Sequence, residues 1–176
     1  MLQNNNKAEK IIIVSTGGTI EKTYDEFEGS LGNRESEVKK RIIAKLRLPY
    51  TELEVFSIIA KDSLHFTEYD RTILVKTIQT QLQKNHPIVV LHGTDTMARS
   101  AERVFKDIPD PKQSVVFTGA MVPMGFEDSD ARQNVTEALL ASKLLSPGIY
   151  ISFHNKVFKV PGVRKNPTIR TFEYQD

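Results

Sequence analysis

Short apolar runs alternate along this chain with longer segments in which apolar residues recur every three or four positions. Four of the runs are continuous and are bounded by turn-forming residues, a pattern typical of strands buried on both faces of a parallel sheet. These predicted strands are 11–15, 88–91, 115–118 and 149–153. A fifth run at 53–59 alternates less cleanly and predicts a weaker strand.

Helical periodicity fills most of the segments between the strands, with predicted helices at 37–46, 69–83, 96–105 and 129–144. Thr67–Asp70 precedes the second helix and resembles a capping box, with Asp in place of the usual Glu or Gln. Pro147 and Gly148 end the last helix. Strands that alternate with helices predict a layered α/β domain with a mostly parallel sheet.

The length of 176 residues suits one compact domain. We expect residues 1–10 to form a flexible polar segment and 11–176 to form a single domain. Gly29–Asn33 is the best candidate for a flexible loop. The polar start has no apolar core of a secretory signal, and no stretch reaches the roughly 20 apolar residues that a membrane span requires.

Charge and cysteine content narrow the classes of function. The chain has 24 basic and 22 acidic residues, a net charge of +2, which gives no electrostatic reason to expect nucleic acid or a membrane as partner. It has no cysteine, so thiolate chemistry and disulfides are excluded. The absence of cysteine fits a reducing compartment, and with neither a secretory signal nor a membrane span in the sequence, we expect a soluble cytoplasmic protein.

Three of the predicted strands run directly into glycine-containing turns. These turns are 16–19 (Thr-Gly-Gly-Thr), 92–96 (His-Gly-Thr-Asp-Thr) and 119–121 (Gly-Ala-Met). Ligands of open parallel sheets bind at the carboxyl ends of the strands, and glycine lets backbone N–H groups approach a ligand closely. We therefore expect the three turns to converge on one crevice.

The side chains of these turns favour hydroxyl chemistry. With no cysteine and no Gly-x-Ser-x-Gly elbow, threonine is the expected nucleophile of any covalent step, and it requires a base. Lys165, Asp95 and the Tyr24 phenol are candidates, and glycine-turn amides could stabilise an oxyanion. We expect Thr16, at the end of its strand, to be structural.

Purely structural interpretations of the same residues are also possible from the sequence. Gly17 and Gly18 could serve only a tight turn, 94–96 could only cap the following helix, and Lys165 could be solvated. The four histidines are His65, His86, His92 and His154, and no pair has the spacing of a metal site. Nucleotide-binding glycine motifs are also absent, so we expect neither a metal nor a cofactor.

Taken together, the motifs resemble those of the bacterial-type L-asparaginases. "TGGTI" at 16–20, "HGTDTM" at 92–97 and "TGAMVP" at 118–123 followed by "SDARQNVTEAL" at 129–139 occur in the family's order. The resemblance covers roughly residues 10–170. It implies a three-layer, flavodoxin-like α/β domain with helices on both faces, of a short type that lacks the usual second domain.

The resemblance also implies roles for particular residues. Thr19 would be the nucleophile, Tyr24 would assist it, and Thr94, Asp95 and Lys165 would form a triad. Ser63 would hold the substrate's α-carboxylate, and Asp95 would also anchor its α-amino group. The implied substrate-binding residues are Gly18, Asp62, Ser63, Gly93 and Ala120.

The implied reaction is hydrolysis of L-asparagine to L-aspartate and ammonia, with L-glutamine a weak second substrate and a homo-oligomer as the active form. The resemblance leaves open whether both threonines attack in turn or water attacks directly. One alternative is a catalytically weak or silent amino-acid-binding protein built on the same domain. Another is the amide-hydrolysing subunit of a transamidation complex.

Overall fold

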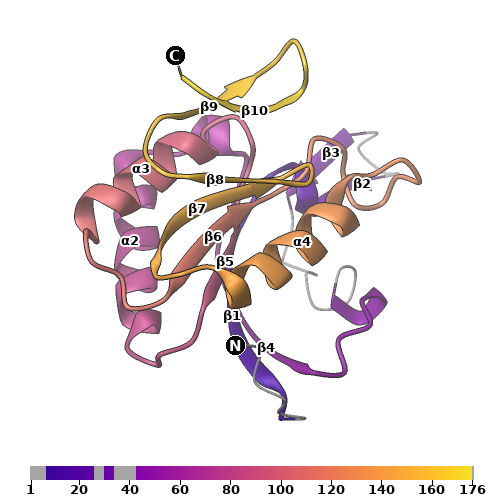
Figure 1. Ribbon diagram of the computed structural model, residues 1–176. Helices are drawn as coiled ribbons and strands as arrows, with labels where there is room; N and C mark the ends of the chain where they lie inside the picture. The colour runs from indigo at the N-terminus through magenta and orange to yellow at the C-terminus, as the bar shows by residue number, and fades with distance from the viewer. Residues whose placement is uncertain (1–6, 26–29, 34–42, 176) are drawn as a thin grey trace.

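A six-stranded sheet forms the centre of the computed structural model, which describes residues 7–25, 30–33 and 43–175 (Figure 1). The strand order is β4-β1-β5-β6-β7-β8, and all neighbours are parallel except β7 and β8. The strands are β1 (Glu9–Gly17), β4 (Thr51–Lys61), β5 (Ile88–Leu91), β6 (Ser114–Thr118), β7 (Gly148–Phe153) and β8 (Lys156–Lys159). The four buried parallel strands and the weaker fifth are therefore confirmed.

Helices cover both faces of this sheet (Figure 1). They are α2 (Glu68–Leu82), α3 (Met97–Asp107) and α4 (Ala131–Leu144). Alternate residues of β1 enter different cores: Ile12 packs in the cluster that includes α2 and α3, and Ile13 in the cluster that includes α4. Because both faces of β1 are covered, its sequence is continuously apolar. The mostly parallel three-layer α/β fold is confirmed.

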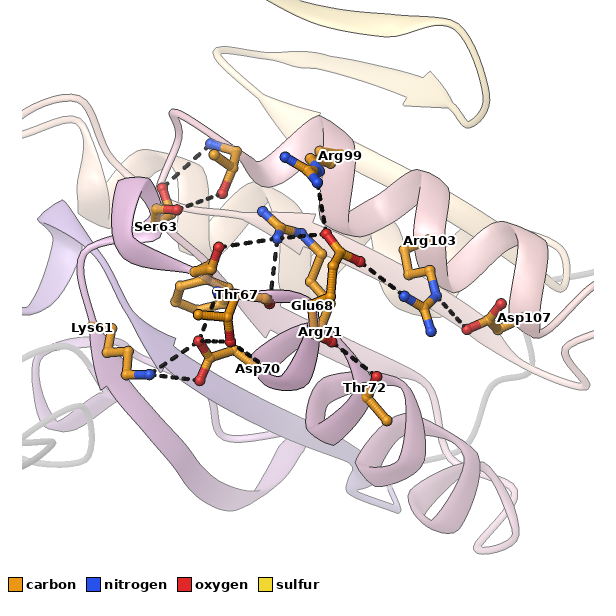
Figure 2. Close-up of polar contacts among 12 residues, drawn as sticks. Lys61, Ser63, Thr67, Glu68, Asp70, Arg71, Thr72, Arg99, Arg103 and Asp107 are labelled. Atoms are coloured by element: carbon orange, nitrogen blue, oxygen red, sulfur yellow. Dashed lines mark hydrogen bonds and ion pairs between the residues drawn. The ribbon is translucent and has the colours of Figure 1, made fainter.

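The capping box before α2 forms as the sequence predicts. The Thr67 hydroxyl accepts a hydrogen bond from the Asp70 backbone N–H, and the Asp70 carboxylate accepts one from the Thr67 N–H. The same carboxylate accepts two hydrogen bonds from Lys61 Nζ, at 2.8 and 3.0 Å (Figure 2). This arrangement ties the end of β4 to the first turn of α2.

Two small antiparallel hairpins lie outside the central sheet. They are β2 (Lys22–Asp25) with β3 (Ser30–Asn33), and β9 (Val163–Asn166) with β10 (Thr171–Tyr174). The sequence predicts a flexible loop at Gly29–Asn33; Gly29 lies outside the described residues, and the prediction is wrong for 30–33, because those residues pair with β2. Glu9 and Lys10 were expected in a flexible segment, but they pair with Thr51 and Glu52 at the start of β1.

Three short 3₁₀ helices complete the description: η1 (Thr19–Glu21), η2 (Ile43–Lys45) and η3 (Ser63–His65). The helix predicted at 37–46 lies outside the described residues as far as position 42, and η2 takes the place of its end. Within the part of the chain that the structure describes, no helix is long and apolar enough to cross a membrane.

Candidate active site

The glycine turns that follow β1 and β5 touch each other, and the turn after β6 joins them. A Cβ atom added to Gly18 would lie 2.5 Å from the Gly93 backbone, and one added to Gly93 would lie 2.5 Å from Ser63 Oγ. A Cβ atom on Gly119 would lie 2.2 Å from the His92 carbonyl oxygen. Side chains do not fit at such separations, so glycine permits the close approach of these segments. The predicted convergence of the three turns is confirmed.

The two threonines that flank Gly17 and Gly18 have different environments. Thr16 is fully buried within β1, and its hydroxyl donates a 2.9 Å hydrogen bond to the Leu91 carbonyl, which joins β1 to the end of β5. Thr19 follows Gly18 directly, begins η1 and is half-buried. Thr16 is thus structural, as expected, whereas Thr19 lies one residue beyond the contact between Gly18 and Gly93.

Lys165 reaches across from β9 to the turn after β5. Its Nζ donates hydrogen bonds to Thr94 Oγ1 and to Asp95 Oδ1, each at 2.8 Å. Thr94 is only 3% exposed, whereas the Asp95 carboxylate keeps 37% of its side-chain surface in contact with solvent. The structure therefore brings together a buried hydroxyl, an ammonium group and a partly exposed carboxylate.

This geometry also decides whether the segment 94–96 only caps the following helix or contributes side chains to the site. The helix that follows begins at Met97, with Thr96 in the N-cap position, and Thr96 makes no side-chain capping bond. The hydroxyl of Thr96 donates instead to the Ser63 carbonyl, at 2.9 Å. Because the side chains of Thr94 and Asp95 meet Lys165, the simple capping interpretation of this segment is wrong.

Ser63 lies at the junction of the turns that follow β4 and β5. It is fully buried, and its Oγ accepts a 3.3 Å hydrogen bond from the Thr96 backbone N–H (Figure 2). The end of β4, just before Ser63, is also joined to the turn after β1, because the Gly18 N–H donates a 3.0 Å hydrogen bond to the Lys61 carbonyl. Ser63 is thus held beside both Gly93 and the start of α3.

Asp62, the neighbour of Ser63, serves a local structural purpose in this arrangement. Its carboxylate accepts hydrogen bonds from the Leu64 N–H at 3.1 Å and from Lys22 Nζ at 2.5 Å. Burial alone would raise the pKa of Asp62, but the ammonium of Lys22 and the Leu64 N–H hold it below its usual value. Asp62 is therefore ionised, and it joins the end of β4 to the start of β2.

Ala120 is buried in the loop after β6, and residues at the start of α4 hold this loop by hydrogen bonds to its backbone. Asn134 Nδ2 donates to the Gly119 carbonyl at 3.0 Å, and the Asp130 carboxylate accepts the backbone N–H groups of Met121 and Val122. Burial would raise the pKa of Asp130, yet these donors keep it lowered. Asn134 and Asp130 did not emerge as site residues from sequence, although both lie within the SDARQNV motif.

His92 orients the turn that carries Thr94. Its ring is fully buried against Phe66 and Phe117, and its Nδ1 lies 2.8 Å from the Gly93 carbonyl oxygen. Burial lowers the pKa of His92 to about 4, so the ring is neutral at neutral pH and its Nδ1–H donates to that carbonyl. Because C=O and N–H point in opposite directions in a trans peptide, the Thr94 N–H faces away from the His92 ring.

Tyr24 occupies β2, where its backbone pairs with Leu31, and its side chain lies outside the described residues. Among residues 7–25, 30–33 and 43–175, no group of three or more His, Asp or Glu side chains is placed to hold a metal ion. The chemistry that the described residues offer is that of hydroxyl, ammonium, carboxylate and backbone amide groups.

The fold and this site define an α/β protein whose candidate active site is built on turns at the carboxyl ends of parallel strands, with a Thr–Lys–Asp cluster at its centre. A family model described as "Asparaginase, N-terminal" matches residues 10–174, and the chain belongs to that family.

Individual relatives agree with this assignment over part of their length. The chain is 28% identical to an L-asparaginase of Thermococcus kodakarensis over 148 residues, which are 84% of this chain and 45% of that protein. It is 35% identical to a human 60 kDa lysophospholipase over 114 residues, 64% of this chain and 20% of that protein. The chain thus spans less than half the length of these relatives.

A solved structure matches the fold over nearly the whole chain. The thermostable L-asparaginase from Thermococcus kodakarensis superposes with a TM-score of 0.85 at 27% identity, covering 94% of this chain and 51% of that one. The three-layer arrangement of strands and helices is therefore the same in both proteins over this region.

Proposed function

We propose that this protein is an amidohydrolase that hydrolyses L-asparagine to L-aspartate and ammonia. The observation that carries the proposal is the bond of Lys165 to both Thr94 and Asp95, 2.8 Å each, beside the contact between Gly18 and Gly93. Family membership supports amide hydrolysis as the class of reaction. A hydroxyl paired with an ammonium and a carboxylate supplies the proton transfer that such a reaction needs.

The buried Ser63 and the partly exposed Asp95 suit the charged end of an amino acid. In the proposed complex the substrate's α-carboxylate lies at Ser63, close to Gly93, and its α-ammonium lies at the Asp95 carboxylate. Gly18 would leave room for the substrate's backbone, and Asp62 would hold Ser63 in place. Recognition of a zwitterion needs one anionic partner and one set of hydrogen-bond donors. Asp95 would be the anionic partner, and the Ser63 hydroxyl with nearby loop amides would supply the donors.

In the proposed mechanism, the Thr19 Oγ attacks the side-chain amide carbon of the substrate, with Tyr24 on β2 assisting removal of its proton. The negative charge that develops on the amide oxygen is stabilised by backbone N–H groups such as that of Thr94, which faces away from His92. The C–N bond then breaks, the nitrogen takes the proton that Thr19 gave up and leaves as ammonia, and an acyl ester to Thr19 remains.

Water then hydrolyses this ester. Its attack on the acyl carbon breaks the ester bond, and the proton that water gives up passes by way of the Thr94 hydroxyl to the departing Thr19 Oγ, which restores the Thr19 hydroxyl and yields L-aspartate. The Lys165–Asp95 pair orients Thr94 for this transfer. Ala120, fixed by the bonds of Asn134 and Asp130 to its neighbours, would supply a backbone contact near the amide. No metal or cofactor takes part in these steps.

Ammonia release from L-asparagine tests the proposal directly. The wild type should release ammonia, and Thr19→Ala and Thr94→Val should each lose most of that activity. Absence of release from the wild type above background rejects the enzyme, and full activity of Thr19→Ala rejects the assignment of the nucleophile. Calorimetric binding of L-aspartate without any turnover of L-asparagine would instead establish the silent amino-acid-binding alternative.

The proposal extends to the setting in which the protein acts. We place it in the cytoplasm, consistent with the absence of cysteine, and as a homo-oligomer, since the exposed part of Asp95 leaves one side of the site for a neighbouring subunit. Light scattering on the purified protein measures the subunit count, and a monomeric mass at full activity would contradict the oligomer.

A further inference from the structure

The turn between β7 and β8 is fastened to α4 by its backbone. His154 and Asn155 occupy it with left-handed φ values of 46° and 62°, as a two-residue hairpin turn requires. The His154 N–H donates to Asn134 Oδ1 at 3.1 Å, and the Asn155 N–H donates to Glu137 Oε2 at 2.7 Å. The turn is thereby held over the first half of α4.

The His154 ring has a polar partner at each nitrogen. Nε2 lies 2.8 Å from Asp130 Oδ2, and Nδ1 lies 3.1 Å from Thr171 Oγ1. Because an ionised carboxylate can only accept, Nε2 carries the hydrogen of the first bond. The Thr171 hydroxyl rotates, so it can donate to a neutral Nδ1 or accept from a protonated one. The ring therefore joins the start of α4 to β10.

Each of these partners is in turn attached to one part of the candidate site. Asp130 accepts the N–H groups of Met121 and Val122, which follow Ala120 directly. On the other side, Thr171 pairs with Asn166, the residue after Lys165. The ring of His154 thus lies between the loop that carries Ala120 and the hairpin that carries Lys165.

The β9–β10 hairpin needs such attachment. It is a two-stranded sheet, separate from the central one, and two-stranded hairpins are marginally stable by themselves. The rings of Phe172 and Phe153 pack edge to face, with 5.0 Å between their centroids, which anchors β10 by an apolar contact. The hydrogen bond between His154 and Thr171 also fixes the orientation of the hairpin. The 2.8 Å hydrogen bond from Lys165 to Thr94 depends on that orientation.

We propose that His154 is a positioning residue that holds the Lys165 hairpin and the Ala120 loop in fixed relation across the site. The inference relies on the proposed function only for the catalytic role of Lys165. His154 itself touches neither Thr94 nor Asp95 through any bond of the described residues, so it acts through Thr171 and Asp130.

Two substitutions test this bridge from different ends. His154→Asn removes the ring and suits the left-handed backbone, which Asn tolerates, and Thr171→Val removes only the hydroxyl while keeping the shape. Because a displacement of about 1 Å can cost about 100-fold in rate, each should lower kcat for ammonia release about 10- to 100-fold, with a smaller change in KM. Thr171→Ser keeps the hydroxyl and should keep the wild-type kcat.

The position of Lys165 can be followed without any assay of activity. In protein labelled with ¹³C at the lysine ε-carbon, Lys165→Arg identifies the Lys165 resonance. His154→Asn and Thr171→Val should both shift that resonance, and Thr171→Ser should not. His86→Asn is the matched control, because His86 precedes the amino end of β5, whereas the candidate site lies at the carboxyl ends of the parallel strands.

The outcomes separate the two hypotheses. A Lys165 resonance unchanged in both His154→Asn and Thr171→Val overturns the positioning role. If both variants shift the Lys165 resonance while the wild type releases no ammonia, the positioning role is supported and the proposed function is rejected. If His154→Asn fails to fold, the pair Thr171→Val and Thr171→Ser decides alone.

Discussion

Lys165 Nζ lies 2.8 Å from Thr94 Oγ1, although 71 positions separate the two residues in the chain. The contact joins β9, in a hairpin outside the central sheet, to the turn after β5. It gives the buried Thr94 hydroxyl an ionised partner, and the same ammonium group also meets Asp95 at 2.8 Å. The activity proposed for this protein depends on that contact.

Lys165→Met should therefore remove most of the activity. Proton transfer by a positioned group contributes about 10²- to 10⁴-fold, so kcat for ammonia release from L-asparagine should fall within that range. The fold should persist, because the Lys165 side chain is partly exposed. Lys159→Met, on the exposed side of β8, is the control and should keep the wild-type rate. Equal rates for both variants would contradict the role of Lys165.

Gly18→Ala should both destabilise the protein and inactivate it. Gly18 has φ +88°, and an added Cβ would lie 2.5 Å from the Gly93 backbone, which cannot move as a flexible side chain can. We expect a loss of at least about 2 kcal/mol in the free energy of unfolding, measured by urea denaturation. Gly125→Ala is the control, because its Cβ would meet nothing within 4 Å. Similar losses for both would refute the packing argument.

The free energy of unfolding should decrease as the pH falls, because the buried His92 resists protonation in the folded protein. Burial lowers the pKa of His92 to about 4 in the folded protein, against about 6.5 for an unfolded chain. Between these values the unfolded chain binds the proton and the folded protein does not, so stability is full above about pH 6.5 and is lost toward pH 4. The loss from this group should be about 3 kcal/mol.

Urea denaturation of wild type and His92→Gln at several pH values measures this contribution. The variant should show a shallower decline between pH 6.5 and 4, whereas His86→Gln should follow the wild type. A wild-type slope that survives in His92→Gln would assign the pH dependence to other groups.

Asp70 and Glu68 offer a matched comparison on α2 (Figure 2). Asp70 is buried, caps the helix and binds Lys61, whereas Glu68 is exposed and pairs with Arg71, Arg99 and Arg103. Asp70→Asn should lower the free energy of unfolding by about 2 kcal/mol. Glu68→Gln should cost less, about 1 kcal/mol, because Gln keeps an oxygen that accepts the hydrogen bond of the buried Arg71, and the ion pairs with Arg99 and Arg103 are solvent-exposed and contribute little.

The pKa of Asp70 adds a pH test to that comparison. Burial would raise it, but Lys61 and Thr67 hold it below its usual value. Asp70 therefore contributes stability above its unfolded pKa of about 3.9, and this is lost as the pH falls further. The difference in stability between wild type and Asp70→Asn should shrink below pH 4. A difference that stays constant into strong acid would contradict the ionised state of Asp70.

The sequence by itself determined the central sheet and the convergence of the glycine turns. Runs such as 11–15 and 88–91 are apolar throughout because both faces of those strands are covered, and no other environment in a parallel sheet would favour that pattern. The capping box at Thr67 and Asp70 was also predictable from the sequence, because its hydrogen bonds are local and its spacing is set by one helical turn.

Tertiary structure decided which polar side chains meet. The sequence pattern shows where the buried strands end and which turns follow them. The hairpin that carries Lys165 has no such pattern, so the distance between Lys165 and Thr94 follows from long-range packing. The same is true of Asp130 and His154, whose partners lie up to 24 positions apart. Local sequence encodes local backbone preference, whereas contacts between distant side chains exist only once the core has placed their backbones.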